Sequence, residues 1–173
     1  GAEYLDSDQK VYHFFESIIP SFKARNQLKR QCVSEEMEED AIYERMQEHE
    51  KYHIFIADLV SFVNNIYNPQ PGVASMHGFV ENITDKGALH NVFFYACFNQ
   101  DNIKEVAGRR IYENFIRMKN GIHLGGKADE QRIFDFNSLP FMERSKAMKV
   151  GNGMIPSEEG EKPCRVVIPL SRG

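Results

Sequence analysis

YHIFIADLVSFV (residues 52–63) and NVFFYACF (residues 91–98) decide the fold expected for this chain. Each contains a short continuous run of aliphatic and aromatic residues, which is typical of a strand buried on both faces of a sheet. In the first segment the run ends at Asp58, and the apolar residues that follow recur at helical spacing. A strand therefore leads directly into a helix there. Strands that alternate with helices predict an α/β protein with a mostly parallel sheet.

Further elements follow from the same periodicities. Apolar residues at helical spacing predict helices over residues 6–31, 76–87 and 103–118. Asp6 or Ser7 can cap the first of these, and Pro20 should kink it or split it. An acidic segment from Ser34 onward suits another helix, because the helix dipole favours negative charge at an N-terminus. Three more short strands are expected in GIHLGG (121–126), GNGMI (151–155) and RVVIPL (165–170).

Length, charge and cysteine content narrow the classes of protein to consider. A chain of 173 residues with 42% hydrophobic and 27% charged residues is long enough for one globular domain. The net charge of -4 offers no general attraction to nucleic acid, so none is expected as a partner. The 3 cysteines form no C-x-x-C pair, which argues against a disulfide framework. The chain begins GAEYLD, without methionine, and is expected to be a fragment of a larger protein.

HEKYH (residues 49–53) matches the H-E-x-x-H pattern of zinc proteases. In that pattern both histidines bind zinc because they lie on one face of a continuous helix. His53, however, belongs to the expected strand, so a junction between helix and strand is the better interpretation. A zinc protease remains an unfavoured alternative.

GIHLGGKA (residues 121–128) is close to the phosphate-binding loop G-x-x-x-x-G-K-[ST]. Ala128 stands where a hydroxyl would bind magnesium, and the segment follows the strand that ends at Asp58 instead of preceding it. We therefore interpret it as a late strand with its exit loop, in which the glycines allow the backbone to turn. Lys127 is then not a phosphate ligand.

Taken in order, several segments resemble FtsK/SpoIIIE-type translocase ATPases. YHIFIADLVSFV is similar to their Walker B strand and the helix after it, and DKGALHNVFFYACFNQ is similar to the segment that leads into the strand with their sensor residues. GGKADEQRIFDF and KVGNGMI are similar to a later K-x-D-x-x-x-I-x-D element and to the closing G-x-G-x-[ML] strand. The set covers residues 50–156. Within this family the resemblance is to the carboxy-terminal, degenerate ATPase domain of EssC-type type VII secretion proteins, including FNQ, HLGG and LPF as they stand here.

This resemblance implies a three-layer, RecA-like (P-loop NTPase-like) α/β fold with a mostly parallel sheet, truncated or degenerate. Residues 1–173 would form a single FtsK/SpoIIIE-like ATPase domain, a C-terminal fragment of a larger multidomain protein. It also implies a remnant of a nucleotide site, with Asp58 at the Walker B position and Asn99 and Gln100 near the sensor position. A helix cap is an equally good interpretation of Asp58. For Asn99 and Gln100, a polar turn at the end of a strand is favoured.

Departures from the family pattern argue against catalysis. Leu59 stands where a glutamate normally activates the attacking water, Phe98 replaces the polar sensor, and no phosphate loop precedes Asp58. We therefore expect no catalytic residue, no metal site and no cofactor in this chain, although ATP and Mg²⁺ serve the parent family. The alternative is part of an active ATP-driven DNA or protein translocase whose Walker A motif lies outside this fragment.

The function that the resemblance implies is that of a non-catalytic module which regulates a type VII secretion motor or recognises secreted substrates. Its expected partners are neighbouring ATPase domains of the same protein, a secreted protein substrate and further copies in a homo-oligomer. Its expected location is the cytoplasm, as part of a membrane-anchored secretion protein.

Because Leu59 cannot activate water and no phosphate loop is present, the purified chain should neither hydrolyse ATP nor bind it tightly. Calorimetric titration with ATP and Mg²⁺ measures this directly. An affinity in the micromolar range would restore the translocase alternative.

Overall fold

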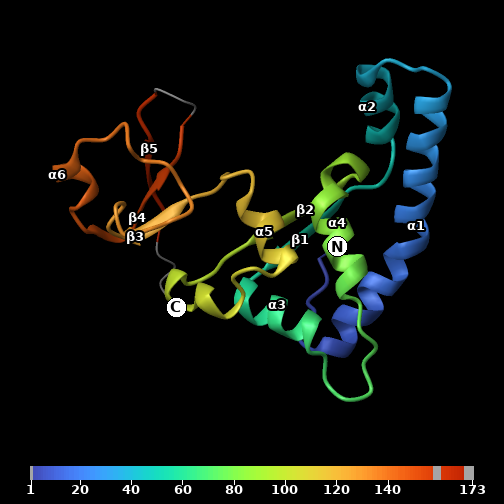
Figure 1. Ribbon diagram of the computed structural model, residues 1–173, viewed down its shortest axis with the longest axis horizontal. Helices are drawn as coiled ribbons and strands as arrows, with labels where there is room; N and C mark the ends of the chain where they lie inside the picture. The colour runs from blue at the N-terminus through green and yellow to red at the C-terminus, as the bar shows by residue number, and fades with distance from the viewer. Residues whose placement is uncertain (1, 158–160, 170–173) are drawn as a thin grey trace. The chain divides into compact units, whose positions relative to one another are not determined.

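The computed structural model describes residues 2–157 and 161–169, and it divides into two compact units, residues 1–114 and residues 115–173 (Figure 1). Each unit contains its own sheet. The expectation of a single ATPase domain over residues 1–173 stays a prediction. Leu170, which ends the predicted strand RVVIPL, lies outside the described residues.

The first unit is built around a parallel pair of strands. Its elements, of which the last runs on into the second unit, are α1 (Asp8–Ser34), α2 (Glu39–Gln47), β1 (Tyr52–Ile56), α3 (Leu59–Tyr67), α4 (His77–Lys86), the 3-10 turn η1 (Gly87–His90), β2 (Val92–Ala96), the 3-10 turn η2 (Gln100–Glu105) and α5 (Arg110–Ile116). The strands β1 and β2 pair in parallel, from Tyr52 opposite Val92 to Ile56 opposite Ala96. The two strands predicted in residues 52–63 and 91–98 are therefore confirmed.

Helix α1 begins and continues as its sequence predicts, with one difference. Ser7 is the N-cap, and its hydroxyl accepts a hydrogen bond from the backbone N–H of Lys10. Pro20 lies inside the helix without splitting it. The ring of Phe15, buried on α1, contacts Phe62 of α3 and Phe79 of α4. These aromatic contacts join the three helices into the core of the first unit.

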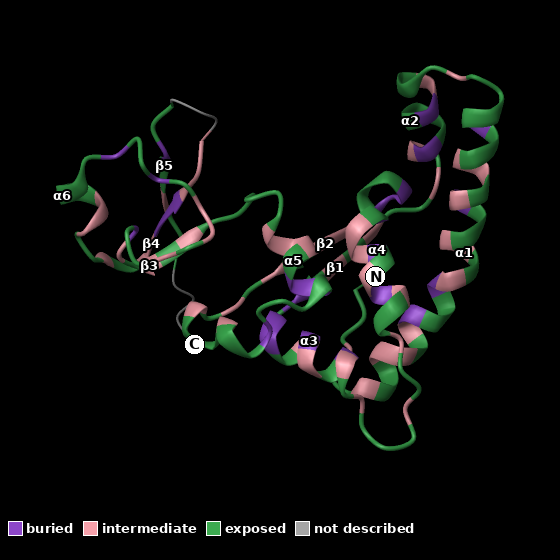
Figure 2. Ribbon diagram, in the orientation of Figure 1, coloured by how far each residue is buried: buried purple, intermediate pink, exposed green. Residues whose placement is uncertain are grey.

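The two faces of the β1–β2 pair differ, contrary to the prediction that both are buried. Ile56 and Val92 are buried, whereas Phe55 is 76% exposed and Tyr95 is 45% exposed. Figure 2 shows how buried, intermediate and exposed residues are distributed along the helices and strands. On the exposed face the rings of Phe55 and Tyr95 stack at 4.7 Å, and His53 stacks on Phe93. Continuous apolar runs predict burial by other elements, but here the rings on one face cover one another instead.

The predicted helix over residues 103–118 is interrupted. Val106 and Ile111 are both buried, as its apolar stripe requires. Between them, however, η2 ends at Glu105, and Gly108 adopts a left-handed φ of 81° before α5 starts at Arg110. A glycine tolerates this conformation at little cost, so the chain changes direction while both apolar residues still reach the core.

The second unit holds a separate antiparallel sheet. Its elements are β3 (His123–Gly126), α6 (Phe141–Arg144), β4 (Met148–Ile155) and β5 (Cys164–Val167), and the strand order is β3-β4-β5. Among the described residues of this unit, the buried core cluster consists of Ala128, Phe136, Leu139 and Met154.

These two sheets correct the expected fold class. The chain is a mixed α/β protein with a small parallel sheet and a separate antiparallel sheet, and a complete three-layer, mostly parallel RecA-like sheet is not shown. Alternation of strands and helices predicts where strands lie, but the direction in which each connection returns the chain decides how they pair. No helix in the described part of the chain is long and apolar enough to cross a membrane.

Two glycines of the α4–η1 segment provide a matched test of this packing. A Cβ at Gly87 would lie 2.7 Å from the carbonyl oxygen of Val92, whereas one at Gly78 would meet nothing within 4 Å. Gly87→Ala should therefore lower the free energy of unfolding by about 1–3 kcal/mol. Gly78→Ala should raise it by about 0.5–1 kcal/mol, because alanine favours helix. Urea denaturation measures both, and equal effects would contradict the close approach of η1 to β2.

Candidate functional site

The candidate nucleotide-site residues lie at the carboxyl ends of the parallel strands. Asp58 follows β1, and Asn99 and Gln100 follow β2. The exits of the two strands are joined, since Cys97 N–H donates to the carbonyl of Ile56 at 2.9 Å. The structure therefore brings the three candidates to one edge of the sheet, which is where ligands bind in open α/β sheets.

The carboxylate of Asp58 is engaged in capping α3. One carboxylate oxygen, Oδ1, accepts a hydrogen bond from the backbone N–H of Val60 at 3.1 Å, and Oδ2 accepts from the hydroxyl of Ser61 at 2.6 Å. Asp58 itself has extended backbone, as an N-cap requires. Both oxygens thus have protein donors, and the carboxylate serves as the cap of α3.

Leu59 is the first residue of α3 and is completely buried, with 0% exposure. Its backbone N–H donates to the carbonyl of Cys97 at 2.8 Å. The residue next to Asp58 is therefore a buried core residue. An alkyl side chain has no group that can accept a proton from water.

The polar residues after β2 form the start of a turn. The side-chain oxygen of Asn99 accepts from the backbone N–H of Asp101 at 3.0 Å and caps η2. Gln100 is the first residue of η2. Just before them, the ring of Phe98 lies edge-to-face with that of Tyr112 at 6.3 Å. The sensor-like role of Asn99 and Gln100 stays a prediction.

The HEKYH segment does not have the geometry of a zinc-binding helix. The helix α2 ends at Gln47, and His53 is already in β1. The carbonyl of His49 accepts a hydrogen bond from the side chain of Asn91, while Nδ1 of His53 lies 3.2 Å from the hydroxyl of Tyr95. Among the described residues no three His, Cys, Asp or Glu side chains are grouped so as to hold a metal ion. The junction between helix and strand is confirmed.

The GIHLGGKA segment is a strand and its exit, as interpreted from its order in the chain. Its strand β3 is antiparallel to β4, and the residues after it form turns instead of a helix. Gly125 and Gly126 have φ values of 65° and 61°. The ammonium of Lys127 lies 2.7 Å from a carboxylate oxygen of Glu130. The glycines turn the backbone, and the lysine pairs with a carboxylate within the turn.

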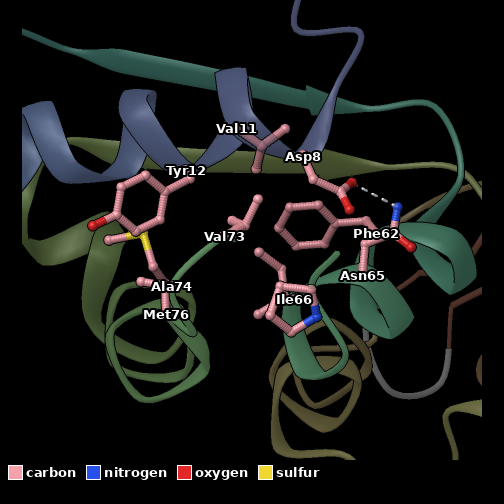
Figure 3. Close-up of a pocket in the computed structure, with 10 residues that line it drawn as sticks. Asp8, Val11, Tyr12, Phe62, Asn65, Ile66, Val73, Ala74 and Met76 are labelled. Carbon is pink, nitrogen blue, oxygen red and sulfur yellow. Dashed lines mark hydrogen bonds between the residues drawn. The ribbon is translucent and has the colours of Figure 1, made fainter. Parts of the chain in front are cut away.

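A small cavity between α1, α3 and the loop of residues 68–76 was not foreseen from the sequence. Its volume is about 60 Å³, and apolar side chains form most of its wall: Val11, Tyr12, Phe62, Ile66, Val73 and Met76 (Figure 3). At its edge the amide of Asn65 donates to the carboxylate of Asp8 at 3.1 Å. The only sequence signal is the helical stripe of α3 beside the proline-containing loop NPQPG. We call this cavity the α1–α3 pocket.

A buried polar cluster holds the start of the parallel strand pair. Arg25 of α1, 3% exposed, donates to the carbonyl of His90 at 2.5 Å and lies over the ring of Tyr52 at 5.3 Å. His90 is 1% exposed. The amide of Asn91 donates to the carbonyls of Met46 and His49. These contacts tie α1 and the end of α2 to the residues that enter β1 and β2.

Comparison with known proteins finds one structural match for this chain. No protein-family model matches the chain, and no curated protein matches it. A solved structure described as the cytoplasmic domain of EssC does match, with a TM-score of 0.63 and 13% sequence identity. This chain shares its fold with part of that domain. The match covers 96% of this chain but 29% of the other, so the likeness is to a segment of a much longer protein.

The double hydrogen bonding of Asp58 predicts a role in stability. Asp58→Ala removes both acceptors and should lower the free energy of unfolding by about 1 kcal/mol. Asp58→Asn should retain most of the stability, because asparagine caps helices equally well. Chemical denaturation of both variants measures the difference. A similar loss in the asparagine variant would show that the bond to Val60 alone does not account for the stability, and that the second acceptor for Ser61 or the charge is needed.

The buried cluster predicts a dependence of stability on pH. Burial, followed by the charges of Lys29, Arg25 and Lys86, lowers the pKa of His90 from 6.5 to about 4. Between these values the unfolded chain binds a proton that the folded chain does not, so stability falls as the pH drops from about 6.5 to about 4. The full difference is about 3 kcal/mol.

Urea denaturation at pH 7 and pH 5 tests this linkage. The loss of stability at pH 5 should be smaller in His90→Gln, which cannot titrate. His13→Gln removes only an exposed imidazole that lies 3.5 Å from Glu16, so it should change the pH dependence far less than His90→Gln does. Equal pH dependence in all three proteins would contradict the assignment to His90.

Proposed function

We propose that this chain is a non-catalytic, ATPase-like module of a type VII secretion protein of the FtsK/SpoIIIE type, and that it recognises a protein segment. The observation that carries this proposal is the shared fold with part of the cytoplasmic domain of EssC over nearly the whole chain. In this proposal the module works at the cytoplasmic side of a membrane-anchored secretion protein. Its partners are neighbouring ATPase domains of that protein, further copies of it and secreted substrates.

The absence of a catalytic role is supported by the strand exit at residues 58–59. Phosphoryl transfer requires a carboxylate that is available to orient magnesium and water, together with a base or water-orienting group. Here the carboxylate of Asp58 accepts hydrogen bonds on both oxygens, and the side chain of Leu59 is completely buried in the core. At this strand exit the carboxylate caps α3, and the residue next to it has no group that can act as a base.

Recognition of a protein segment is supported by the α1–α3 pocket. A volume of about 60 Å³ suits a single aliphatic side chain and is far too small for a nucleotide. Burial of such a side chain against the apolar wall would stabilise the complex by roughly 1.5–3 kcal/mol of binding free energy. The polar pair of Asp8 and Asn65 at the edge can hydrogen-bond the backbone of the bound segment. An aliphatic residue presented by an exposed helix or extended segment fits this arrangement.

Binding of labelled peptides tests this proposal. Peptides from the terminal segments of type VII secreted substrates of the same organism are titrated with the chain, and fluorescence anisotropy is measured. Ala74→Phe, which places a ring at the pocket, should weaken binding by about tenfold or more, the equivalent of one buried aliphatic group. Ala24→Phe, at an exposed position of α1 outside the pocket, is the matched control and should bind like the wild type.

Two outcomes contradict the proposal. If no substrate peptide binds at concentrations up to the millimolar range, and a neighbouring ATPase domain does not bind either, the chain is not a recognition module. If both phenylalanine variants bind equally well, recognition takes place elsewhere on the chain.

A further inference from the structure

The second unit contains a polar cavity of about 340 Å³, lined in part by the segment that resembles the K-x-D-x-x-x-I-x-D element. The loop of residues 128–137 forms most of its wall, and Lys119 and Arg144 complete it. This volume lies at the lower end of the range for small-molecule sites. The cavity is independent of the α1–α3 pocket, which belongs to the other unit.

One nitrogen of the Arg144 guanidinium, Nε, lacks a protein partner in the described part of the chain. The Nη1 of Arg144 donates to the side-chain oxygen of Asn137. Its Nε is buried and has no hydrogen-bond partner among the described residues. An unsatisfied buried donor costs about 1–3 kcal/mol, so an acceptor at this place would be stabilising. The edge formed by Nε and Nη2 is the one that binds carboxylate and phosphate oxygens in pairs.

Charges around the cavity favour a small anion. Arg132 and Lys119 line the wall together with Arg144, against the carboxylates of Asp129 and Asp135. One oxygen of Asp135 is already used, since it accepts from the backbone N–H of Asn137 at 2.8 Å. Three cations against two carboxylates leave an excess of one positive charge, which matches a singly charged oxyanion better than a polyphosphate.

The loop that forms the wall is held in shape by one side chain. The amide nitrogen of Gln131 donates to the carbonyls of Ala128 and Phe134, and its oxygen accepts from the N–H groups of Ile133 and Phe134. The backbone N–H of Asp129 donates to the carbonyl of Arg144 at 3.3 Å. The loop and Arg144 are therefore already joined in the absence of a ligand. Because the loop is ordered beforehand, binding loses little conformational entropy.

We propose that this cavity binds a small oxyanion, a carboxylate or a phosphate group, on the side edge of the Arg144 guanidinium. Arg132 and Lys119 add long-range attraction. The apolar ring of Phe134 in the same wall accommodates the part of the ligand attached to the anion. The site is separate from the proposed recognition of protein segments, and either can hold without the other.

Titration of the full chain followed by NMR tests the proposal. Sodium acetate and inorganic phosphate are added at constant ionic strength, with sodium chloride as the reference, and the Nε–H signal of Arg144 is observed. That signal is identified by its loss in Arg144→Lys. We expect a saturable shift with at least one oxyanion and none with chloride. A response to acetate alone or phosphate alone identifies the group that the site takes.

Variants separate this site from general surface charge. The shifts of neighbouring backbone amides should saturate about tenfold more weakly in Arg144→Lys, which keeps the charge but loses the fork. Arg132→Gln should weaken binding while leaving the Arg144 signal in place. The matched control is Arg165→Gln in the same unit, whose side chain pairs with Glu143, and it should bind like the wild type.

The proposal is overturned if chloride shifts the signal as much as the oxyanions do, or if no addition produces a saturable shift. It is also overturned if Arg132→Gln and Arg165→Gln weaken binding equally. Should Arg144→Lys fail to fold, as judged by circular dichroism, the comparison of the other two variants still decides.

Discussion

The parallel pairing of β1 with β2 is the contact on which the candidate site of the first unit depends. The register from Tyr52 opposite Val92 to Ile56 opposite Ala96 joins segments that are far apart along the chain. Parallel strands require a long crossover, here provided by α3 and α4, and both helices pack through aromatic rings against α1. Once the strands are paired, their carboxyl ends must lie together, and the residues that follow share one edge.

At that edge, two uses of the same carboxylate compete. An aspartate at the end of a strand can hold a cation for nucleotide chemistry, or it can accept hydrogen bonds from the first turn of the next helix. In this chain Asp58 makes the second set of contacts, and Leu59 beside it is buried in the core. The hydrogen bonds of Asp58 are those of a helix cap. This is why recognition, and not turnover, is the function we propose.

Buried polar groups hold the β1–β2 pair in place, and they also make the stability of the protein depend on pH. Arg25, His90 and Asn91 fasten the amino ends of the strands to α1 and α2. The same burial that makes these contacts strong disfavours a charged imidazole, so the pKa of His90 falls to about 4. On the other side of the sheet, stacked rings of His53, Phe55, Phe93 and Tyr95 form an exposed face. The amino ends of β1 and β2 are thus surrounded by buried polar groups, whereas the exposed face of the pair is covered by aromatic rings.

The sequence by itself determined the elements whose causes are local. The strand at residues 52–56, the helix that begins at Leu59 and the cap at Ser7 follow from apolar spacing and capping chemistry, because each depends on residues within a few positions. The break at Gly108 was missed although glycine was visible there, because the apolar stripe on either side continued in helical register.

Only the tertiary structure decided how the strands pair and which atoms remain available. Separate parallel and antiparallel sheets, the open aromatic face and the α1–α3 pocket depend on contacts between distant segments, and local periodicity carries no information about these. The same is true of Asp58 and Arg144. The position of Asp58 in the sequence suggested a binding role, whereas nothing in the sequence suggested one for Arg144. Which polar atoms of these side chains have a protein partner depends on the hydrogen bonds that form in the folded chain.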